Sequence, residues 1–246
     1  MAVEFDSLEQ KTWNLGTFFG IDSSFLEINS QTVIHTWFVL LLLTGLVILC
    51  RLIIERKQNV ARYLILSSIN SFVELVSQTI GYFAYNHFSF IFSIFLFILT
   101  CNFIGVIPWA HEPTQDLNTT LGLALIAFFY KDFYAIKHQR WGYLKEFCTP
   151  FFLMFPINVI GHFSKIISLS FRLFGNIFAG SIIVELYRTL IGGSVILQTA
   201  GLISGLNFVI LTFFVIFDGA IQAYVFAMLS LTYLALSIQE EHTEES

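Results

Sequence analysis

The chain has 246 residues, of which 56% are hydrophobic and only 12% are charged. Soluble globular domains carry about 25% charged residues, so this composition excludes an ordinary soluble enzyme and indicates a polytopic membrane protein. The net charge of -5 says little about partners, because the acidic residues gather at the two ends of the chain. The three cysteines, Cys50, Cys101 and Cys148, show no spacing typical of a disulfide framework or a metal site.

The first 32 residues are polar and mixed, and we predict that they form a segment on the outer side of the membrane. The first apolar stretch, Val33 to Ile54, is long enough to cross a bilayer, which takes about 20 residues. The densest basic cluster of the chain follows it, so the positive-inside rule places this end inside and the N-terminus outside. That cluster consists of Arg51, Arg56, Lys57 and Arg62.

The next stretch, Tyr63 to Tyr82, alternates apolar residues with Ser67, Asn70, Glu74 and Gln78 at helical spacing. This pattern is typical of an amphipathic helix on the inner membrane surface. A weakly hydrophobic spanning helix is the alternative. We favour the surface helix, because a crossing here would conflict with the charges of the later loops.

A hairpin of two crossings is predicted next. Phe88 to Pro108 is apolar except for Thr100 and Asn102, and the following loop, Trp109 to Asn118, contains no Lys or Arg, as expected of an outer loop. The return helix begins at Leu117, and Lys131 near its end can extend towards the inner surface. The next loop is inner because it is basic, with Lys137, Arg140 and Lys145.

Two long apolar stretches complete the chain, Phe151 to Leu190 and Val195 to Ile238, with Gly192-Gly193-Ser194 as the turn. As helices, Pro156–Leu190 and Val195–Ile238 would measure about 52 and 66 Å, more than a hydrocarbon core of about 30 Å, so they must tilt, kink or extend past it. The predicted fold is all-α, with five crossings, one interfacial helix and two long, strongly tilted last helices. We divide the chain into 1–32, a membrane domain at 33–238 and an acidic inner tail at 239–246.

Arg172 stands in the middle of the first long stretch. A cation at the centre of a bilayer costs at least ~3 kcal/mol on insertion scales, so it normally faces a partner or a water-filled path. No acidic residue lies within one helical turn, and Glu185 is about 20 Å away along a helix. We therefore expect the counter-charge of Arg172 to lie on another chain.

The helix face that carries Arg172 is small and polar, and small faces let a second helix approach closely. Ordinary packing within the chain is the alternative. Glu185 and Arg188 point away from this face and are spaced to pair with each other. Within about 60° of Arg172 at helical spacing lie Asn158, Gly161, Lys165, Ser168, Gly175, Asn176, Ala179 and Ile183.

The second long stretch places Asn207, Asp218 and Gln222 on one side of a helix. Asp218 is a single carboxylate in a deeply apolar run, and intramembrane acids are functional by default. A hydrogen bond to a neighbouring helix is the structural alternative.

The run from Ser168 to Asn176, with Ala179-Gly180 and the later Ile221 to Phe226, resembles subunit a of the F-type ATP synthase. Pro113 to Thr120 and Pro156 to Gly161 resemble other segments of that family. The resemblance implies a membrane stator against which a ring of c subunits rotates. Arg172 matches the family's essential arginine, Gln222 its glutamine at the same membrane level, and Asn176 the asparagine one turn after the arginine.

The resemblance also implies two offset half-channels for protons that meet at the c ring, on either side of Arg172. This role is not enzymatic, and we expect no cofactor, metal or nucleic acid. The expected partners are the c ring and the b-type subunits of a peripheral stalk, in a bacterial plasma membrane or, as the alternative, a mitochondrial inner membrane. The outer half-channel would be formed by Asn102, Asp116, Asn207, Glu185, Asp218 and Gln222, and the inner one by Asn158, His162, Lys165, Ser168 and Glu74.

The chain departs from the family pattern at Ser181 and Val215, where many relatives carry titratable groups. Glu185 and Asp218 each lie about one turn from those positions. Sodium coupling is left open by the sequence. A secondary transporter binding an anion at Arg172 is a second hypothesis, but no internal repeat of the kind usual in transporters is visible. A structural subunit of a respiratory complex is a third.

Overall fold

The computed structural model describes most of the chain, and its regular elements are almost all helices. The main helices are α2 (Ser30–Glu55), α3 (Val60–Ile80), α4 (Tyr85–Phe103), α5 (Leu117–Gln139), α7 (Phe155–Gly192) and α10 (Gly219–Gln239). Shorter pieces are the 3₁₀-helices η2 (Ile104–Val106) and η3 (Pro113–Gln115) and the π-helix η5 (Thr212–Asp218). The described residues are 12–14, 27–55, 60–106, 112–139, 154–193, 199, 204–205, 208–209 and 212–239.

Six described helices are long and apolar enough to cross a membrane. The predicted class, an all-α polytopic membrane protein, is therefore confirmed. One small feature was not predicted: β1 (Thr12–Asn14) and β2 (Glu27–Asn29) pair as an antiparallel ladder just before α2.

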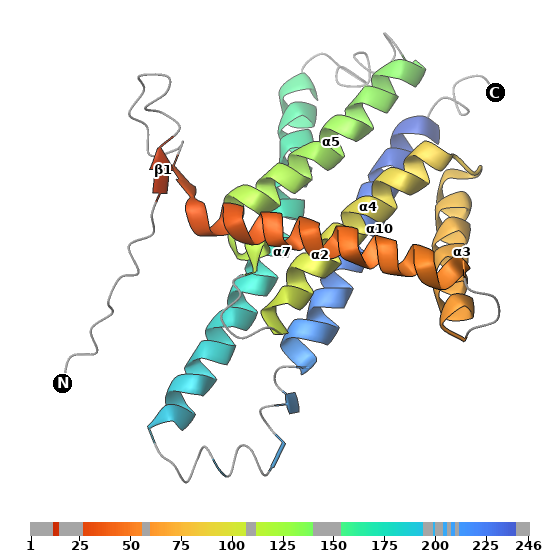
Figure 1. Ribbon diagram of the computed structural model, residues 1–246. Coiled ribbons are helices and arrows are strands. Elements are labelled where there is room, and N and C mark those ends of the chain that lie inside the picture. The colour runs from red at the N-terminus through yellow and green to blue at the C-terminus, as the bar shows by residue number, and fades with distance from the viewer. Residues whose placement is uncertain are drawn as a thin grey trace.

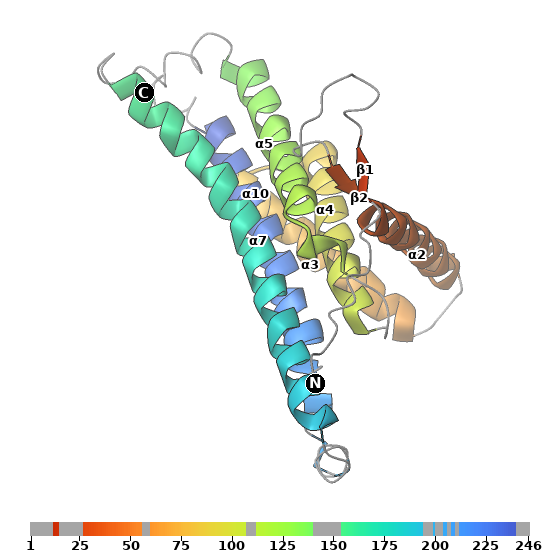
Figure 2. The same cartoon turned by 90° about the vertical axis from the view of Figure 1, so that its left-hand side faces the viewer.

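The centre of the molecule is a bundle of α4, α5, α7 and α10 (Figures 1 and 2). Helix α2 runs across this bundle in Figure 1 and is largely exposed, with Val39 packed beside Cys101 and Ile104. Apolar side chains at helical spacing fill the space between the four central helices. This core consists of Ile94, Ile98, Ala124, Ala127, Phe128, Ile166, Leu169, Leu173, Ile177, Ala223 and Phe226.

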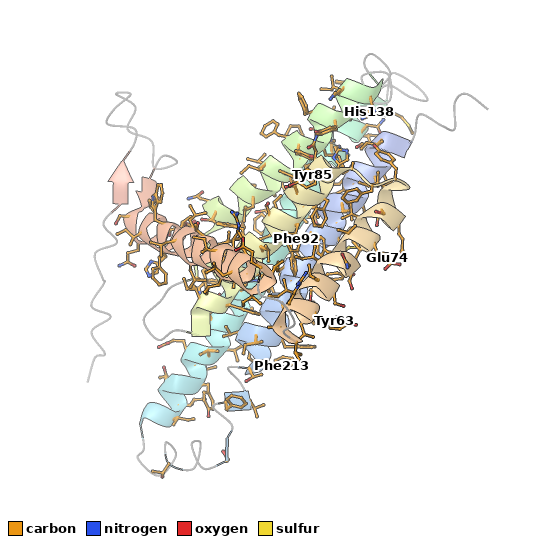
Figure 3. All side chains as sticks on the ribbon, turned by 45° about the vertical axis from the view of Figure 1, so that its right-hand side comes forward. Tyr63, Glu74, Tyr85, Phe92, His138 and Phe213 are labelled. Carbon is orange, nitrogen blue, oxygen red and sulfur yellow. The ribbon has the colours of Figure 1, made fainter. Side chains whose placement is uncertain are left out.

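Helix α3 is amphipathic, as its sequence predicts. Phe72, Val76 and Ile80 form one buried face against α4 and α10, while Glu74 and Gln78 lie on the exposed face. Figure 3 shows Glu74 directed away from the bundle. Helix α3 is also among the six helices that could cross a membrane by length and composition, so the surface position remains a prediction.

Within the described residues, the last apolar stretch is interrupted, which is one of the alternatives that its length left open. Ser204 and Gly205 form a turn in which Gly205 has a φ of 69°, a backbone conformation that favours glycine. From Thr212 onwards the chain forms first the π-helix η5 and then, from Gly219, the α-helix α10. By contrast, α7 is a single helix of 38 residues, close to the predicted Pro156–Leu190.

Helices α4 and α10 approach most closely where α10 begins. A Cβ atom at Gly219 would lie 3.0 Å from the Cβ of Asn102, which leaves almost no room for a side chain. The same approach allows the Asn102 amide to donate to the backbone oxygen of Gly219 at 2.9 Å.

Replacing Gly219 with Ala should force the two helices apart and destabilise the chain by about 1 kcal/mol, as overpacking does. The measurement is the thermal unfolding temperature of the purified complex. The control is Gly45→Ala in α2, where an added Cβ has no neighbour within 4 Å. Equal unfolding temperatures for the two variants would contradict the close approach.

Candidate functional site

Helix α7 has one face packed within the chain and one face that is not. The packed face lies against α5 and α10 and includes Ser170, whose Oγ is 3.2 Å from Oγ1 of Thr120. The face carrying Arg172 lies about 115° around the helix from it. Along that second face, Gly161, Lys165, Ser168, Arg172, Ala179 and Ile183 are exposed and Asn158, Gly175 and Asn176 are half-buried. Packing against the described part of the chain, the alternative left open by the sequence, therefore leaves most of this face uncovered.

The Arg172 side chain is exposed. It makes no hydrogen bond or ion pair with any residue that the structure describes. An unpaired guanidinium at membrane depth is expensive, so this position requires an anionic or polar group from outside the described chain. The sequence-based expectation of an external counter-charge is thus consistent with the geometry.

The antiparallel α7 and η5–α10 set the relative levels of the polar residues. A Cβ atom at Gly180 would lie 3.6 Å from Cδ1 of Phe214, so these two residues are neighbours. Counting eight residues inward from each, about 12 Å, reaches Arg172 on α7 and Gln222 on α10. The two residues therefore lie at about the same membrane level, and Gln222 is 7% exposed. Asn176 lies four residues from Arg172 towards Gly180, and Asp218 lies four residues from Gln222 towards Phe214. By the same count, Asn176 and Asp218 also lie at about the same level.

Asn102 links three segments on the outer side of that level. Its side-chain amide donates to the backbone oxygen of Gly219, and its Oδ1 accepts a hydrogen bond from Oγ1 of Thr114 at 3.0 Å. Both side chains are buried. The outer loop is thereby attached to the start of α10, directly beside Asp218, which is half-buried at the end of the π-helix.

Asp116 has a local structural role. Its Oδ1 accepts a hydrogen bond from the backbone N–H of Asn118 at 3.0 Å, and its backbone oxygen accepts one from Thr120. The first bond satisfies an N–H group in the first turn of α5 that has no helical partner, and the second is the first i→i−4 bond of the helix. The half-buried carboxylate thus fixes the start of α5 within the loop that contacts Asn102.

Glu112 was not singled out from the sequence, yet it is the buried acid of the outer loop. Its carboxylate covers Gly105 in η2, where an added Cβ would overlap with Oε1 of Glu112. Burial raises the pKa of Glu112 to about 7, against a weaker opposing effect of a hydrogen bond with Gln115. Because η2 packs against η5, this carboxyl lies in the same outer region as Asn102 and Asp218.

The remaining outer candidates are not gathered there. Glu185 is exposed on the part of α7 that projects beyond the bundle (Figures 1 and 2). The predicted pairing of Glu185 with Arg188 cannot be placed, since the Arg188 side chain is outside the described residues. Asn207 also lies outside them. Ser181 donates to the backbone oxygen of Phe178 at 2.8 Å.

On the inner side, His162 belongs to a cluster that the sequence did not reveal. Its Nε2 is 2.9 Å from Nζ of Lys131 and 3.1 Å from Oδ1 of Asp132. Lys131 and Asp132 form an ion pair at 2.9 Å. The signal in the sequence is Asp132, a single acid beside a lysine in an apolar helix, but its proximity to His162 depends on how α5 packs against α7.

The other inner candidates are more dispersed. Lys165 is exposed, with Nζ 5.7 Å from the centre of the Tyr233 ring, and Ser168 is exposed on the Arg172 face. Asn158 is half-buried near the start of α7. Glu74 accepts a hydrogen bond from Gln78 at 3.1 Å on the exposed face of α3, away from the other four.

The raised pKa of Glu112 leads to a prediction about how the stability of the fold depends on pH. A folded-state pKa of about 7 against 4.5 for a free glutamate stabilises the fold below about pH 4.5, and this contribution is lost as the pH rises through 7. Glu112→Gln should therefore gain stability over wild type at pH 8.5, on the order of 3 kcal/mol, and gain little at pH 4.5. Unfolding temperatures of the purified complex at both pH values test this.

The matched control for Glu112 is Glu55→Gln, because Glu55 is an exposed acid on α2 that pairs with Arg51. This control should show the same pH dependence as wild type. An equal gain in stability for Glu112→Gln at pH 4.5 and 8.5 would contradict burial as the cause.

Comparisons with known proteins show the family of this chain. Relatives include ATP synthase subunit a 2 of Acaryochloris marina, which is 32% identical and aligned over 88% of this chain and 89% of its own. The chloroplastic ATP synthase subunit a of Stigeoclonium helveticum is 33% identical over 88% and 87%, and the subunit a of Citrifermentans bemidjiense is 31% identical over 89% and 92%. The sequence profile of the family described as ATP synthase A chain matches residues 33–235. The chain belongs to the ATP synthase A chain family.

Proposed function

We propose that this chain is the ion-translocating stator of an F-type ATP synthase, in which Arg172 faces the carboxylates carried past it by a ring of c subunits. The observation that carries the proposal is the exposed face of α7. That face holds a guanidinium with no ion pair among the described residues, and it is lined by residues small enough for another helix to approach closely. A ring of helices that each carry one acid supplies both the helix and the charge.

Protons reach the ring through two half-channels that meet at the level of Arg172 and Gln222. The outer half-channel contains Asp218 and Asn102, which the Asn102–Gly219 hydrogen bond holds beside each other. Asn176 faces it from α7 at about the same level as Asp218. Asp116, Glu185 and Asn207 complete the outer set proposed from the sequence. The inner half-channel includes His162, Lys165 and Ser168, with Asn158 near its mouth.

Arg172 separates the two half-channels electrostatically. Its guanidinium attracts each arriving carboxylate in the ionised form, and it repels a proton that would pass directly from one half-channel to the other. Arginine suits this role because it stays charged in almost any environment. The membrane potential supplies about 2.3 kcal/mol per elementary charge per 100 mV, so each leaked proton would waste that free energy.

The proposal includes an outer N-terminus, an inner C-terminus and contact with the b-type subunits of a peripheral stalk. The basic inner ends of the apolar segments support the orientation. Protons are the proposed coupling ion and the bacterial plasma membrane the proposed location. With 38 residues, α7 is about 57 Å long, which supports a strong tilt across a core of about 30 Å.

Replacing Arg172 with Ala should abolish ATP-driven proton pumping, because no other cation lies at that level of the exposed face in the described part of α7. Lys should restore it only in part, since a lysine can lose its proton when it is desolvated. Pumping is measured by acidification of inverted vesicles that contain the whole complex. Arg51→Ala on α2 is the control and should pump normally. Coupled pumping by Arg172→Ala would exclude the stator role.

The two acids on the outer side should differ in importance. Asp218 adjoins the Asn102–Gly219 contact one turn from Gln222, whereas Glu185 is exposed at the far end of α7. Asp218→Asn should therefore slow proton-driven ATP synthesis about tenfold, as expected for loss of a proton-transfer group. Glu185→Gln should slow it by about twofold at most, since surrounding water can replace an exposed group. Equal rates in reconstituted vesicles would leave Asp218 a structural acid.

A further inference from the structure

Three ionisable side chains meet between α5 and α7 on the side of Arg172 opposite to Asp218. Lys131 and Asp132 lie seven to eight residues before the end of α5, and His162 lies seven residues after the start of α7. Each is thus about 10–12 Å from its helix end. The three distances among Nζ, Oδ1 and Nε2 are 2.9, 2.9 and 3.1 Å, so these atoms form a closed triangle.

The triangle can hold His162 in two protonation states without moving. When Nε2 carries no proton, it accepts a hydrogen bond from the Lys131 ammonium, which also donates to Asp132. When Nε2 carries a proton, it donates to Asp132 and the lysine keeps its own bond to that carboxylate. Both arrangements use the same three side chains as hydrogen-bond partners.

The surroundings fit a site that exchanges protons with water. Phe128 packs edge-on against the imidazole at 5.5 Å, and Nζ of Lys131 lies 5.4 Å from the centre of the same ring. The side chains of Lys131, His162 and Asp132 are 11%, 16% and 24% exposed. Ionisable groups in a membrane domain that keep some exposure normally face a water-filled path.

Among the described residues, the charged and titratable groups around His162 come from three helices. Lys131 and Asp132 belong to α5, and Lys165 lies one turn further along α7. Tyr233 of α10 packs against Phe128 at 5.6 Å and lies below the Lys165 ammonium. Through Lys165, the cluster adjoins the α7 face that carries Arg172, so a proton leaving that face has a short route to it.

We propose that Lys131, Asp132 and His162 form a proton-release site of the inner half-channel, in which His162 takes up and gives off the proton. This release site rests on the stator function proposed above. It adds Lys131 and Asp132 to the residues that influence the transfer of the proton. Lys131 and Asp132 are positioning residues, because they hold the imidazole and set its charge without themselves passing the proton on.

The step needs only water as a co-reactant. A hydrated proton from the c ring side forms the N–H bond at Nε2 while an O–H bond of the hydronium ion breaks and leaves water. The imidazolium then loses one of its two N–H protons to a water molecule on the inner side, which becomes hydronium. The pair of steps returns His162 to its neutral form and moves one proton inward.

The test uses the whole complex in vesicles, with ATP synthesis measured at several inner pH values under a constant total driving force. An imidazole that carries the transferred proton should make the wild-type rate depend on the inner pH. His162→Gln keeps a hydrogen-bonding side chain but cannot titrate, so it should lose this pH dependence and run about tenfold slower. Asp132→Asn should change the pH profile, because the imidazolium loses its hydrogen-bonded counter-charge, and Asp132→Glu should restore the wild-type profile.

The control is His35→Gln, which removes a histidine on α2 that bonds to the backbone oxygen of Gln31. Its rate and profile should match wild type. Assembly is followed by the amount of this chain in the purified complex. Assembled His162→Gln with a wild-type profile would overturn the proposal. So would failure of both His162→Gln and Asp132→Asn to assemble, since that result assigns the cluster to structure alone.

These outcomes separate the two proposals. If Arg172→Ala abolishes pumping while His162→Gln behaves as wild type, the stator function stands and the release site does not. If Arg172→Ala pumps normally, the stator function fails whatever the histidine variants do.

Discussion

The cost of placing charge in an apolar medium organises this molecule. Each ionisable group within the described helical bundle either has a partner or lies at a surface where a partner can be supplied. Lys131 and Asp132 neutralise each other beside His162, and Asp116 is held by the first turn of α5. Arg172 belongs to the second kind, since it has no ion pair among the described residues and is exposed on a face of small residues. Under the proposed function, a carboxylate of the ring supplies that partner.

A second constraint is the close contact of α4 with α10. The absence of a side chain at Gly219 lets Asn102 reach the backbone, and the other end of the same amide holds Thr114 of the outer loop. One side chain thus positions three segments that are distant in sequence, and it does so beside Asp218. In an apolar environment such buried hydrogen bonds are worth keeping because the unpaired alternative is costly.

Much of the fold could be predicted because hydrophobic length and charge placement are local properties. The bounds of α7 follow from Pro156 at its start and the glycines at its end, and the importance of Arg172 follows from its apolar surroundings. The amphipathic character of α3 could likewise be predicted from the spacing of its polar residues. The π-helix η5 and the turn at Gly205 could not be predicted, because a mainly apolar stretch is compatible with either a straight or a broken helix.

The contacts within the site depend on how helices pair, which no single stretch of sequence specifies. Asp132 could be noticed as an acid in an apolar helix, but its proximity to His162, 30 positions away, follows from the packing of α5 on α7. Glu112 is adjacent to a proline in a polar loop, and only the fold shows that its carboxylate covers Gly105. The level shared by Arg172 and Gln222 likewise depends on the contact of Gly180 with Phe214.

The length of α7 also has a mechanical consequence. Under the proposed function, a rotating ring attracted to Arg172 would pull the helix sideways at every step, and a helix of 38 residues held only at its ends would bend under that load. Helix α7 instead contacts its neighbours at three positions along its length. His162 contacts Lys131 and Asp132, Ser170 contacts Thr120, and Gly180 contacts Phe214. Arg172 lies between the contacts at Ser170 and Gly180 and is two residues from Ser170. Under the proposed function, a sideways force on Arg172 would therefore pass from α7 into α5 and η5, because these contacts support the helix along its length.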